Sequence, residues 1–170
     1  MDELDRKTVD EFKEAFKTPV VVVLDNIRSM HNVGSVFRTS DAFLIEAICI
    51  CGFTPQPPHR DIHKTALGAT ETVDWFYFEN TKDAVFALKE KGYCLFAVEQ
   101  TTTSISLKKF NASNYKKLAV VFGNEVEGVD NEVIKLCEGC IEIPQEGMKH
   151  SLNISVAAGI VLWKLFESKL

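Results

Sequence analysis

The sequence has no apolar run long enough to cross a membrane and no basic segment at its start. Its longest apolar stretches, residues 20–24 and 154–163, are well below the roughly 20 residues that a transmembrane helix needs. The first five residues, MDELD, are acidic, whereas a signal peptide begins with basic residues. We therefore expect no membrane association and a cytoplasmic location.

Positive charge is also scarce. The chain has 19 Lys and Arg against 24 Asp and Glu, a net charge of −5, which argues against binding of nucleic acid by bulk electrostatics. Any such contact must depend on a local patch. The candidates are HRDIHK (59–64), with Arg60 and Lys64, and a group of lysines at 108, 109, 116 and 117, although paired surface lysines are most often only a solvated face.

A disulfide framework and a metal site are not expected. Five cysteines, an odd number, lie in apolar segments, which favours buried free thiols. Cys137 and Cys140 form one CxxC pair, but no second pair of ligands lies at a suitable spacing for zinc. Either thiol could in principle be a nucleophile. Neither has a histidine neighbour in the sequence that would activate it.

The sequence does contain alternating strand and helix patterns. Continuous β-branched and apolar runs, typical of strands buried on both faces of a parallel sheet, occur at residues 20–25, 45–51, 73–78, 93–98, 118–123 and 140–144. Helical patterns occur at residues 3–17, 33–43, 81–91, 130–137 and 151–168. With 170 residues and 46% hydrophobic composition, the chain is predicted to be one α/β domain, residues 1–170, with a mostly parallel sheet flanked by helices.

Ligands bind beyond the carboxyl ends of the strands in such sheets, so the segments that leave each strand are the candidates for a site. The first exit has Asn32 at a predicted N-cap, Gly34 in the first turn and Arg38 six residues after the cap. It lacks the closely spaced glycines of a dinucleotide-binding turn, and no GxxxxGK[ST] occurs. Arg38 could direct a fork of donors at a ligand or phosphate, or simply cover apolar surface with its stem.

Two later exits also combine glycine with polar residues. FGNEVEGVDNEV (122–133) has two glycines around two carboxylates, and Asp130 is placed to cap the next helix. EGMKHSLNISVAAGIVLW (146–163) passes from a loop into an apolar helix that Ser151 or Asn153 could cap. Three such exits at one end of one sheet predict a shared pocket.

HNVGSVFRTSDAF (31–43), VVFGNEVEGV (120–129) and IEIPQEGMKHSLNISVAAGIVLW (141–163) resemble, in order and spacing, the three motifs of the SpoU/TrmH branch of the SPOUT RNA 2′-O-ribose methyltransferases. The resemblance covers about residues 20–168. It implies an α/β domain whose cofactor-binding part, about residues 93–168, is tied into a deep trefoil knot. Periodicity and spacing do not reveal a knot.

The resemblance also implies a set of site residues. The matching polar active-site positions are Asn32, Arg38, Glu125, Ser151 and Asn153. The matching positions for S-adenosylmethionine are Val98, Gly123, Asn124, Ile143, Ser151, Leu152 and Asn153. Because a guanidinium has a pKa above about 12 and no acceptor, we interpret Arg38 as a stabiliser of the developing alkoxide rather than as a base, with Asn32 to orient it.

By the same resemblance, the chain is expected to methylate a ribose 2′-hydroxyl in tRNA or rRNA, without a metal, as a homodimer that packs through its last helix. Many relatives carry an RNA-binding domain or basic extensions, whereas this chain is acidic. The sequence does not identify the RNA, although the small surface favours tRNA. The alternative is a module that binds S-adenosylmethionine and RNA without turnover.

Overall fold

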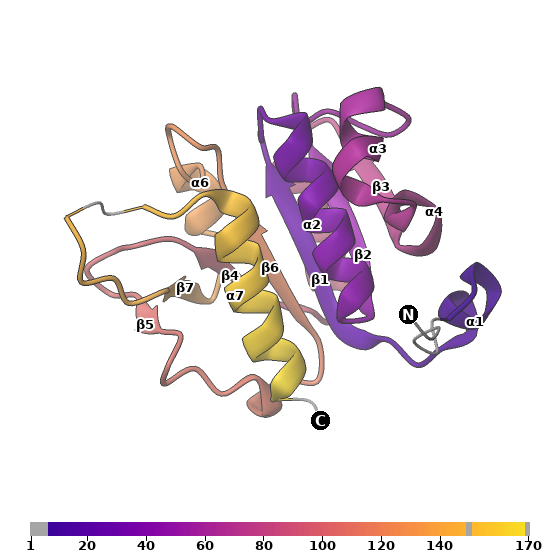
Figure 1. Cartoon of the computed structure of the whole chain (residues 1–170). Coiled ribbons are helices and arrows are strands. Elements are labelled where there is room, and N and C mark those ends of the chain that lie inside the picture. The colour runs from indigo at the N-terminus through magenta and orange to yellow at the C-terminus, as the bar shows by residue number, and fades with distance from the viewer. Residues whose placement is uncertain (1–6, 149–150, 169–170) are drawn as a thin grey trace.

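The computed structural model describes residues 7–148 and 151–168, which form an α/β domain (Figure 1). Seven strands make one sheet in the order β3-β2-β1-β6-β4-β7-β5, and every neighbouring pair is parallel. The strands are β1 (Thr18–Asp25), β2 (Ile45–Cys51), β3 (Asp74–Phe78), β4 (Cys94–Val98), β5 (Ile105–Ser106), β6 (Leu118–Phe122) and β7 (Gly139–Glu142). All strands therefore end at the same edge of the sheet.

The central strand β1 shows why the valine run folds this way. Val20 and Val22 face one apolar core and Val21 and Val23 face the other, and all four are buried. Successive side chains of a strand point to opposite faces, so only a continuous apolar run can fill both cores. This confirms the prediction of a parallel sheet covered on both faces.

Helices cover both faces of the sheet. The helices α1 (Val9–Glu14), α2 (Met30–Ala42), α3 (Arg60–Ala66), α4 (Ala69–Thr72) and α7 (Ile154–Glu167) contribute to one core. The other core receives α5 (Thr81–Glu90) and α6 (Asn131–Ile134). A short 3₁₀ turn, Ala112–Asn114, contributes Ala112 to the first core. Figure 1 shows α2 lying between α7 and α3. No helix of the described part is long and apolar enough to span a bilayer.

The structure corrects four parts of the predicted fold. The helix predicted at 3–17 is only Val9–Glu14, with Phe16 92% exposed; residues 3–6 lie outside the described part. The run at 73–78 forms an edge strand whose Phe76 and Tyr77 are exposed, not a strand buried on both faces. The helices α3 and α4 and the strand β5 were not predicted. The helix predicted from residue 33 begins at Met30, capped by Ser29 instead of Asn32.

Gly34 fixes the position of α3 against α2. A Cβ atom on Gly34 would lie 2.3 Å from the backbone oxygen of Ile62 and 2.1 Å from Oγ1 of Thr65. The Thr65 hydroxyl also donates a hydrogen bond of 3.0 Å to the backbone oxygen of His31. The two helices therefore pack backbone to backbone at this glycine, which any side chain would force apart.

We predict that Gly34→Ala lowers the free energy of unfolding by about 1–3 kcal/mol, because overpacking against a backbone oxygen outweighs alanine's roughly 1 kcal/mol advantage in a helix. Urea denaturation of Gly34→Ala beside Ser35→Ala measures this. The neighbouring substitution should stay within about 0.5 kcal/mol of the wild type. Equal stabilities of the two variants would show that α2 and α3 can separate without cost.

Candidate functional site

A cavity of about 490 Å³ lies at the carboxyl edge of the sheet. Its lining comes from three segments: residues 98–100 after β4, residues 122–128 after β6, and residues 141–157 from β7 into α7, of which 149–150 are outside the described part. Because β4, β6 and β7 run parallel side by side, segments far apart in the sequence leave the sheet at one place. The shared pocket predicted at three strand exits is confirmed for the exits of β6 and β7, whereas the cavity lining contains the exit of β4 in place of the exit of β1.

The Glu125 carboxylate joins the loop after β6 to the start of α2. Its oxygens accept hydrogen bonds from the backbone N–H of Arg28 at 3.0 Å, the backbone N–H of Ser29 at 3.3 Å and the side-chain amide of Asn32 at 3.0 Å. Partial burial alone would raise the pKa of Glu125, but the bonds from Arg28 and Asn32 hold this pKa below its ordinary value. The carboxylate is therefore ionised at neutral pH, and its stabilisation is lost as the pH falls through the folded-state pKa.

A second bond extends this network to the last helix. The Asn153 amide donates to the side-chain oxygen of Asn32 at 3.2 Å. The Asn153 oxygen accepts from the backbone N–H and the hydroxyl of Ser155, at 2.8 and 2.6 Å, and so caps α7. Of the two residues predicted to cap this helix, Asn153 is the N-cap residue and Ser151 is not. Asn32, Glu125 and Asn153 thus form one chain of hydrogen bonds.

The loop after β6 is braced from within. Asn124 is 6% exposed; its side-chain amide donates to the backbone oxygen of Asn26 at 2.7 Å, and its side-chain oxygen accepts from the backbone N–H groups of Val126 and Glu127. A Cβ atom on Gly123 would lie 2.1 Å from the backbone of Gly128. Gly123 is therefore required for close backbone approach.

A buried carboxylate that the sequence reasoning missed holds this loop to the sheet. Asp25 is 2% exposed and accepts hydrogen bonds from Thr81 at 2.6 Å, the Asn26 amide at 3.0 Å and the backbone N–H of Asp130 at 3.0 Å. The predicted cap at Asp130 is confirmed, since its carboxylate accepts from the Glu132 N–H. The end of β1 is thus tied to α5 and to the loop before α6.

The predicted site residues do not all meet. The cavity lining includes Val98, Gly123, Asn124, Glu125, Ile143, Ser151, Leu152 and Asn153. Asn32 reaches this group through its bonds to Glu125 and Asn153. Arg38 does not reach this group. It is exposed on α2, six residues after Asn32, so the two residues are about 9 Å apart along the helix axis. The Asn32 side chain instead forms hydrogen bonds with Glu125 and Asn153. This arrangement does not support the prediction that Asn32 orients Arg38.

The cavity has an acidic lining. Among its described lining residues are four glutamates, at 99, 125, 127 and 142, and no lysine, arginine or histidine. Sequence reasoning missed Glu99, whose carboxylate accepts a 3.2 Å bond from the backbone N–H of Val129. Glu99 directly follows β4, so its place at a strand exit was the available signal. This lining suits a ligand that carries positive charge.

The two cysteines of the CxxC pair are poorly suited to nucleophilic attack. All five cysteines are free, as predicted. Burial raises the pKa of Cys137 to about 12 and also raises that of Cys140, so both stay protonated near neutral pH. Protonated thiols are weak nucleophiles, so this argues against the alternative in which one of them attacks a substrate. Within the described residues, no group of three or more His, Cys, Asp or Glu side chains is placed to hold a metal ion.

Asp25→Ala should lower the free energy of unfolding by about 2–4 kcal/mol, because three donors would lose the buried acceptor that they share. Asp25→Asn keeps one acceptor oxygen, so its free energy of unfolding should fall by less. Glu127→Ala, which removes an exposed carboxylate from the loop after β6, is the matched control and should change the stability by less than about 0.5 kcal/mol. Urea denaturation of the three variants measures these changes in the free energy of unfolding. If Asp25→Ala proves as stable as the control, the buried carboxylate does not brace the site.

Comparisons with known proteins point to one family. Residues 19–163 match the family described as the SpoU rRNA Methylase family. The chain is 30% identical over 169 residues to the 23S rRNA (guanosine-2′-O-)-methyltransferase RlmB of Vibrio cholerae, covering 99% of this chain and 67% of that protein. It is 31% identical over 167 residues to the tRNA (guanosine(18)-2′-O)-methyltransferase of Thermus thermophilus, covering 97% and 83%.

Solved structures show the same fold. A crystal structure of an AdoMet-bound rRNA methyltransferase from Sinorhizobium meliloti superposes with a TM-score of 0.84 at 24% identity, covering 94% of this chain and 60% of that chain. The chain described here thus spans about two thirds of the Vibrio protein's length and less of the Sinorhizobium protein's.

Proposed function

The chain belongs to the SpoU rRNA methylase family, and we propose that it transfers a methyl group from S-adenosylmethionine to the 2′-hydroxyl of a ribose in tRNA or rRNA. The observation that carries this proposal is the bond chain of Glu125, Asn32 and Asn153 at the cavity. It joins residues of all three motif segments that resemble the family, beside a pocket of suitable size.

The cavity fits S-adenosylmethionine in volume and charge. Its roughly 490 Å³ lies within the range of about 300–1,000 Å³ that is usual for small-molecule sites. S-adenosylmethionine carries one net positive charge, which suits the four lining glutamates. When bound, it supplies a methyl group activated by a sulfonium. Val98, Gly123, Asn124, Ile143, Ser151, Leu152 and Asn153 would hold it, as the resemblance implies.

The chain's own residues would position the ribose. Each amide nitrogen of Asn32 and Asn153 uses one N–H within the network and keeps a second that can donate to a hydroxyl or a phosphate. The ionised Glu125 fixes Asn32, and the Ser151 hydroxyl lines the same cavity. Holding the reacting groups in place is worth roughly 7–11 kcal/mol in favourable cases, so this network is suited to lowering the barrier without a metal.

Arg38 would stabilise the oxygen that becomes an alkoxide. Because it is exposed on α2 and apart from its own cavity, we infer that it serves the cavity of a second subunit. The surface of α7 supports a homodimer: Val156, Ile160 and Trp163 are 49%, 39% and 50% exposed. They recur at helical spacing, so they form one apolar stripe beside α2, and such stripes mark interaction sites.

We further infer that residues 93–168 form a deep trefoil knot within a single methyltransferase domain, residues 1–170, that acts on RNA in the cytoplasm. The sheet order supports the knot, because β7 lies between β4 and β5 although β5 follows β4 directly in the chain. The family match over residues 19–163 supports one domain. A backbone trace from an experimental structure that shows no knot would overturn the first inference.

Two measurements test the function. Calorimetric titration with S-adenosylmethionine should show one site per chain. Transfer of a labelled methyl group from S-adenosylmethionine to RNA should then occur without added metal. Binding without transfer would favour the module that lacks turnover, and absence of binding would refute the proposal.

Arg38→Ala should reduce methyl transfer by about 10²–10³-fold, the usual effect of removing one donor to a developing anion, and leave the Kd for S-adenosylmethionine unchanged. Arg38→Lys should also be severely impaired, because a point charge cannot reproduce a planar fork of donors. Single-turnover rates and the cofactor titration separate the two effects. Near-wild-type turnover by the lysine variant would mean that charge alone matters.

Mixing two inactive variants tests whether the site is shared. Arg38→Ala removes the arginine, and Asn153→Ser removes the amide but keeps a residue that can cap α7. Random co-assembly in a shared-site dimer should restore about a quarter of wild-type turnover, because half of the dimers regain one of two sites. No recovery in mixtures of proven heterodimers would place Arg38 at its own cavity.

Trp163→Glu, which places a charge in the apolar stripe, should yield monomers by light scattering.

A further inference from the structure

Two segments around the start of α2 carry a net positive charge because they contain few acidic residues. Residues 26–40 and 52–68 contain four of the arginines and lysines, one acidic residue and three of the four histidines, although the whole chain has a net charge of −5. Arg60, His63 and Lys64 are all exposed on α3, and their spacing places them on one helix face. We call these three residues, with the exposed His31 of α2, the α3 basic surface.

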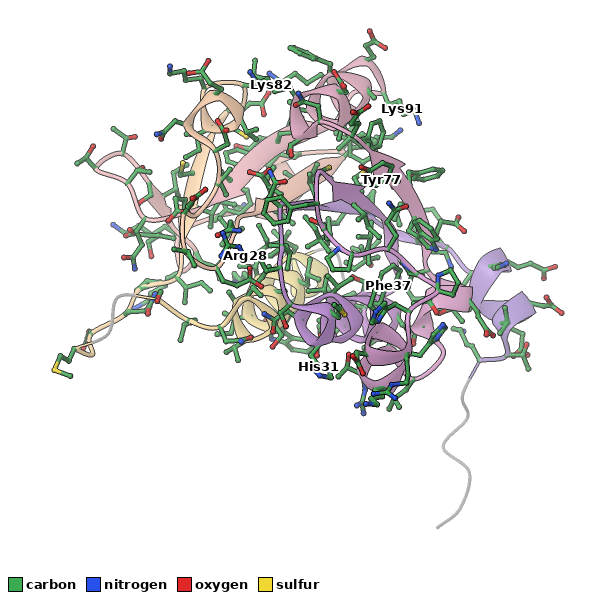
Figure 2. The ribbon with its side chains drawn as sticks, turned by 90° about the horizontal axis from the view of Figure 1, so that it is seen from above. Arg28, His31, Phe37, Tyr77, Lys82 and Lys91 are labelled. Carbon is green, nitrogen blue, oxygen red and sulfur yellow. The ribbon has the colours of Figure 1, made fainter. Side chains whose placement is uncertain are left out.

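This surface is held at a fixed place relative to the cavity. The close packing of α3 at Gly34 and the bond from Thr65 to His31 attach it to the first turn of α2. The next residue, Asn32, is bonded to Glu125 of the cavity lining. In the view from above, Arg28 and His31 flank the start of α2 (Figure 2). The α3 basic surface is thus linked to the site through rigid helix packing.

The other group of lysines is less well placed. Lys116 and Lys117 directly precede β6, whereas Gly123 of the site directly follows it, so the two lie at opposite ends of a strand about 17 Å long. Lys117 also contacts its own neighbours: it donates to the backbone oxygen of Lys91 and lies over the Tyr93 ring. Those two lysines therefore point to no ligand at the site.

We propose that the α3 basic surface binds the phosphates that flank the target ribose. This rests on the proposed function. The start of α2 contacts the cavity lining through Asn32 and packs against α3, whose exposed side chains include two cations. Arg60 offers a planar fork and Lys64 a point charge, both suited to phosphate oxygens. Figure 1 shows α2 lying between α3 and α7, so the α3 basic surface and the exposed apolar stripe of α7 are separate surfaces of the chain.

Asp61 limits the strength of this surface. Its carboxylate lies 3.5 Å from the Arg60 guanidinium and 3.0 Å from the Lys64 ammonium. A phosphate must compete with this carboxylate for both cations. Without RNA, the internal pairs hold the two side chains and reduce the attraction for unrelated polyanions. Removing the carboxylate should therefore strengthen RNA binding, which is an effect that a purely structural role of Asp61 would not produce.

The test compares three variants by their KM for an RNA substrate at several salt concentrations. Arg60→Gln/Lys64→Gln should raise KM about tenfold and reduce the slope of log affinity against log salt by about 1.4–1.8, the value for two phosphate contacts. Asp61→Asn should lower KM severalfold. The matched control Lys116→Gln/Lys117→Gln should stay within about twofold of the wild type. The Kd for S-adenosylmethionine and the melting temperature should stay unchanged in all three.

Failure of this proposal differs from failure of the proposed function. If the wild type methylates RNA but Arg60→Gln/Lys64→Gln keeps its KM and salt slope, the α3 basic surface does not bind RNA. A loss confined to Lys116→Gln/Lys117→Gln, or to a Lys108→Gln/Lys109→Gln variant, would assign the phosphates to that surface instead. If the wild type itself neither binds S-adenosylmethionine nor methylates RNA, the proposed function is wrong.

Discussion

The Glu125 carboxylate, which binds the backbone at the start of α2 and the side chain of Asn32, is the interaction on which the rest of the site depends. It connects the exit of β6 with the exit of β1, about a hundred residues apart in the chain. Asn32 in turn accepts a hydrogen bond from Asn153, the residue that caps α7. Loss of the carboxylate would leave the Asn32 side chain held only by its bond to Asn153, and the buried Asp25 could still hold the loop but not the Asn32 amide.

Charge is divided between the inside and the outside of this site. The cavity lining contains four glutamates, whereas the neighbouring helix α3 exposes Arg60, His63 and Lys64. A cationic methyl donor and an anionic RNA would each meet a surface of opposite sign, separated only by the first turn of α2. An acidic chain can therefore act on RNA without a high overall positive charge, since attraction matters most within about 8–10 Å of the contact at physiological salt.

The sequence predicted the parts of the fold that depend on local pattern. Valine runs can be buried on both faces only in a covered parallel sheet, so β1 and β6 were predicted correctly. The aromatic run at 73–78 has the same strand propensity, but whether a strand lies at an edge depends on its neighbours. The helix α3 is short and follows two prolines, so its periodicity is weak. Asn32 was mistaken for a cap because Ser29, three residues earlier, could equally serve.

The candidate site was predicted where motif residues meet through the sheet and missed where a long-range partner decides. Glu125 and Asn153 lie at strand exits, so their convergence with the cavity could be expected from a parallel sheet. Asp25 ends a valine run and looks like an ordinary strand end; its role is visible only once Thr81 and Asp130 lie beside it. Arg38 is a surface residue within one subunit, and no pattern in a single chain shows what a second subunit would bring to it.

The central claim is that the ribose 2′-oxygen receives the methyl group. The most direct measurement is mass spectrometry of nucleosides from RNA that the purified protein has methylated with isotope-labelled S-adenosylmethionine, with a parallel substrate that carries a single 2′-deoxy substitution at the target. The account predicts a labelled 2′-O-methylnucleoside from the first RNA and no labelled product from the second, which should still bind nearly as well. A labelled methyl group on a base nitrogen or carbon, in either RNA, would contradict it.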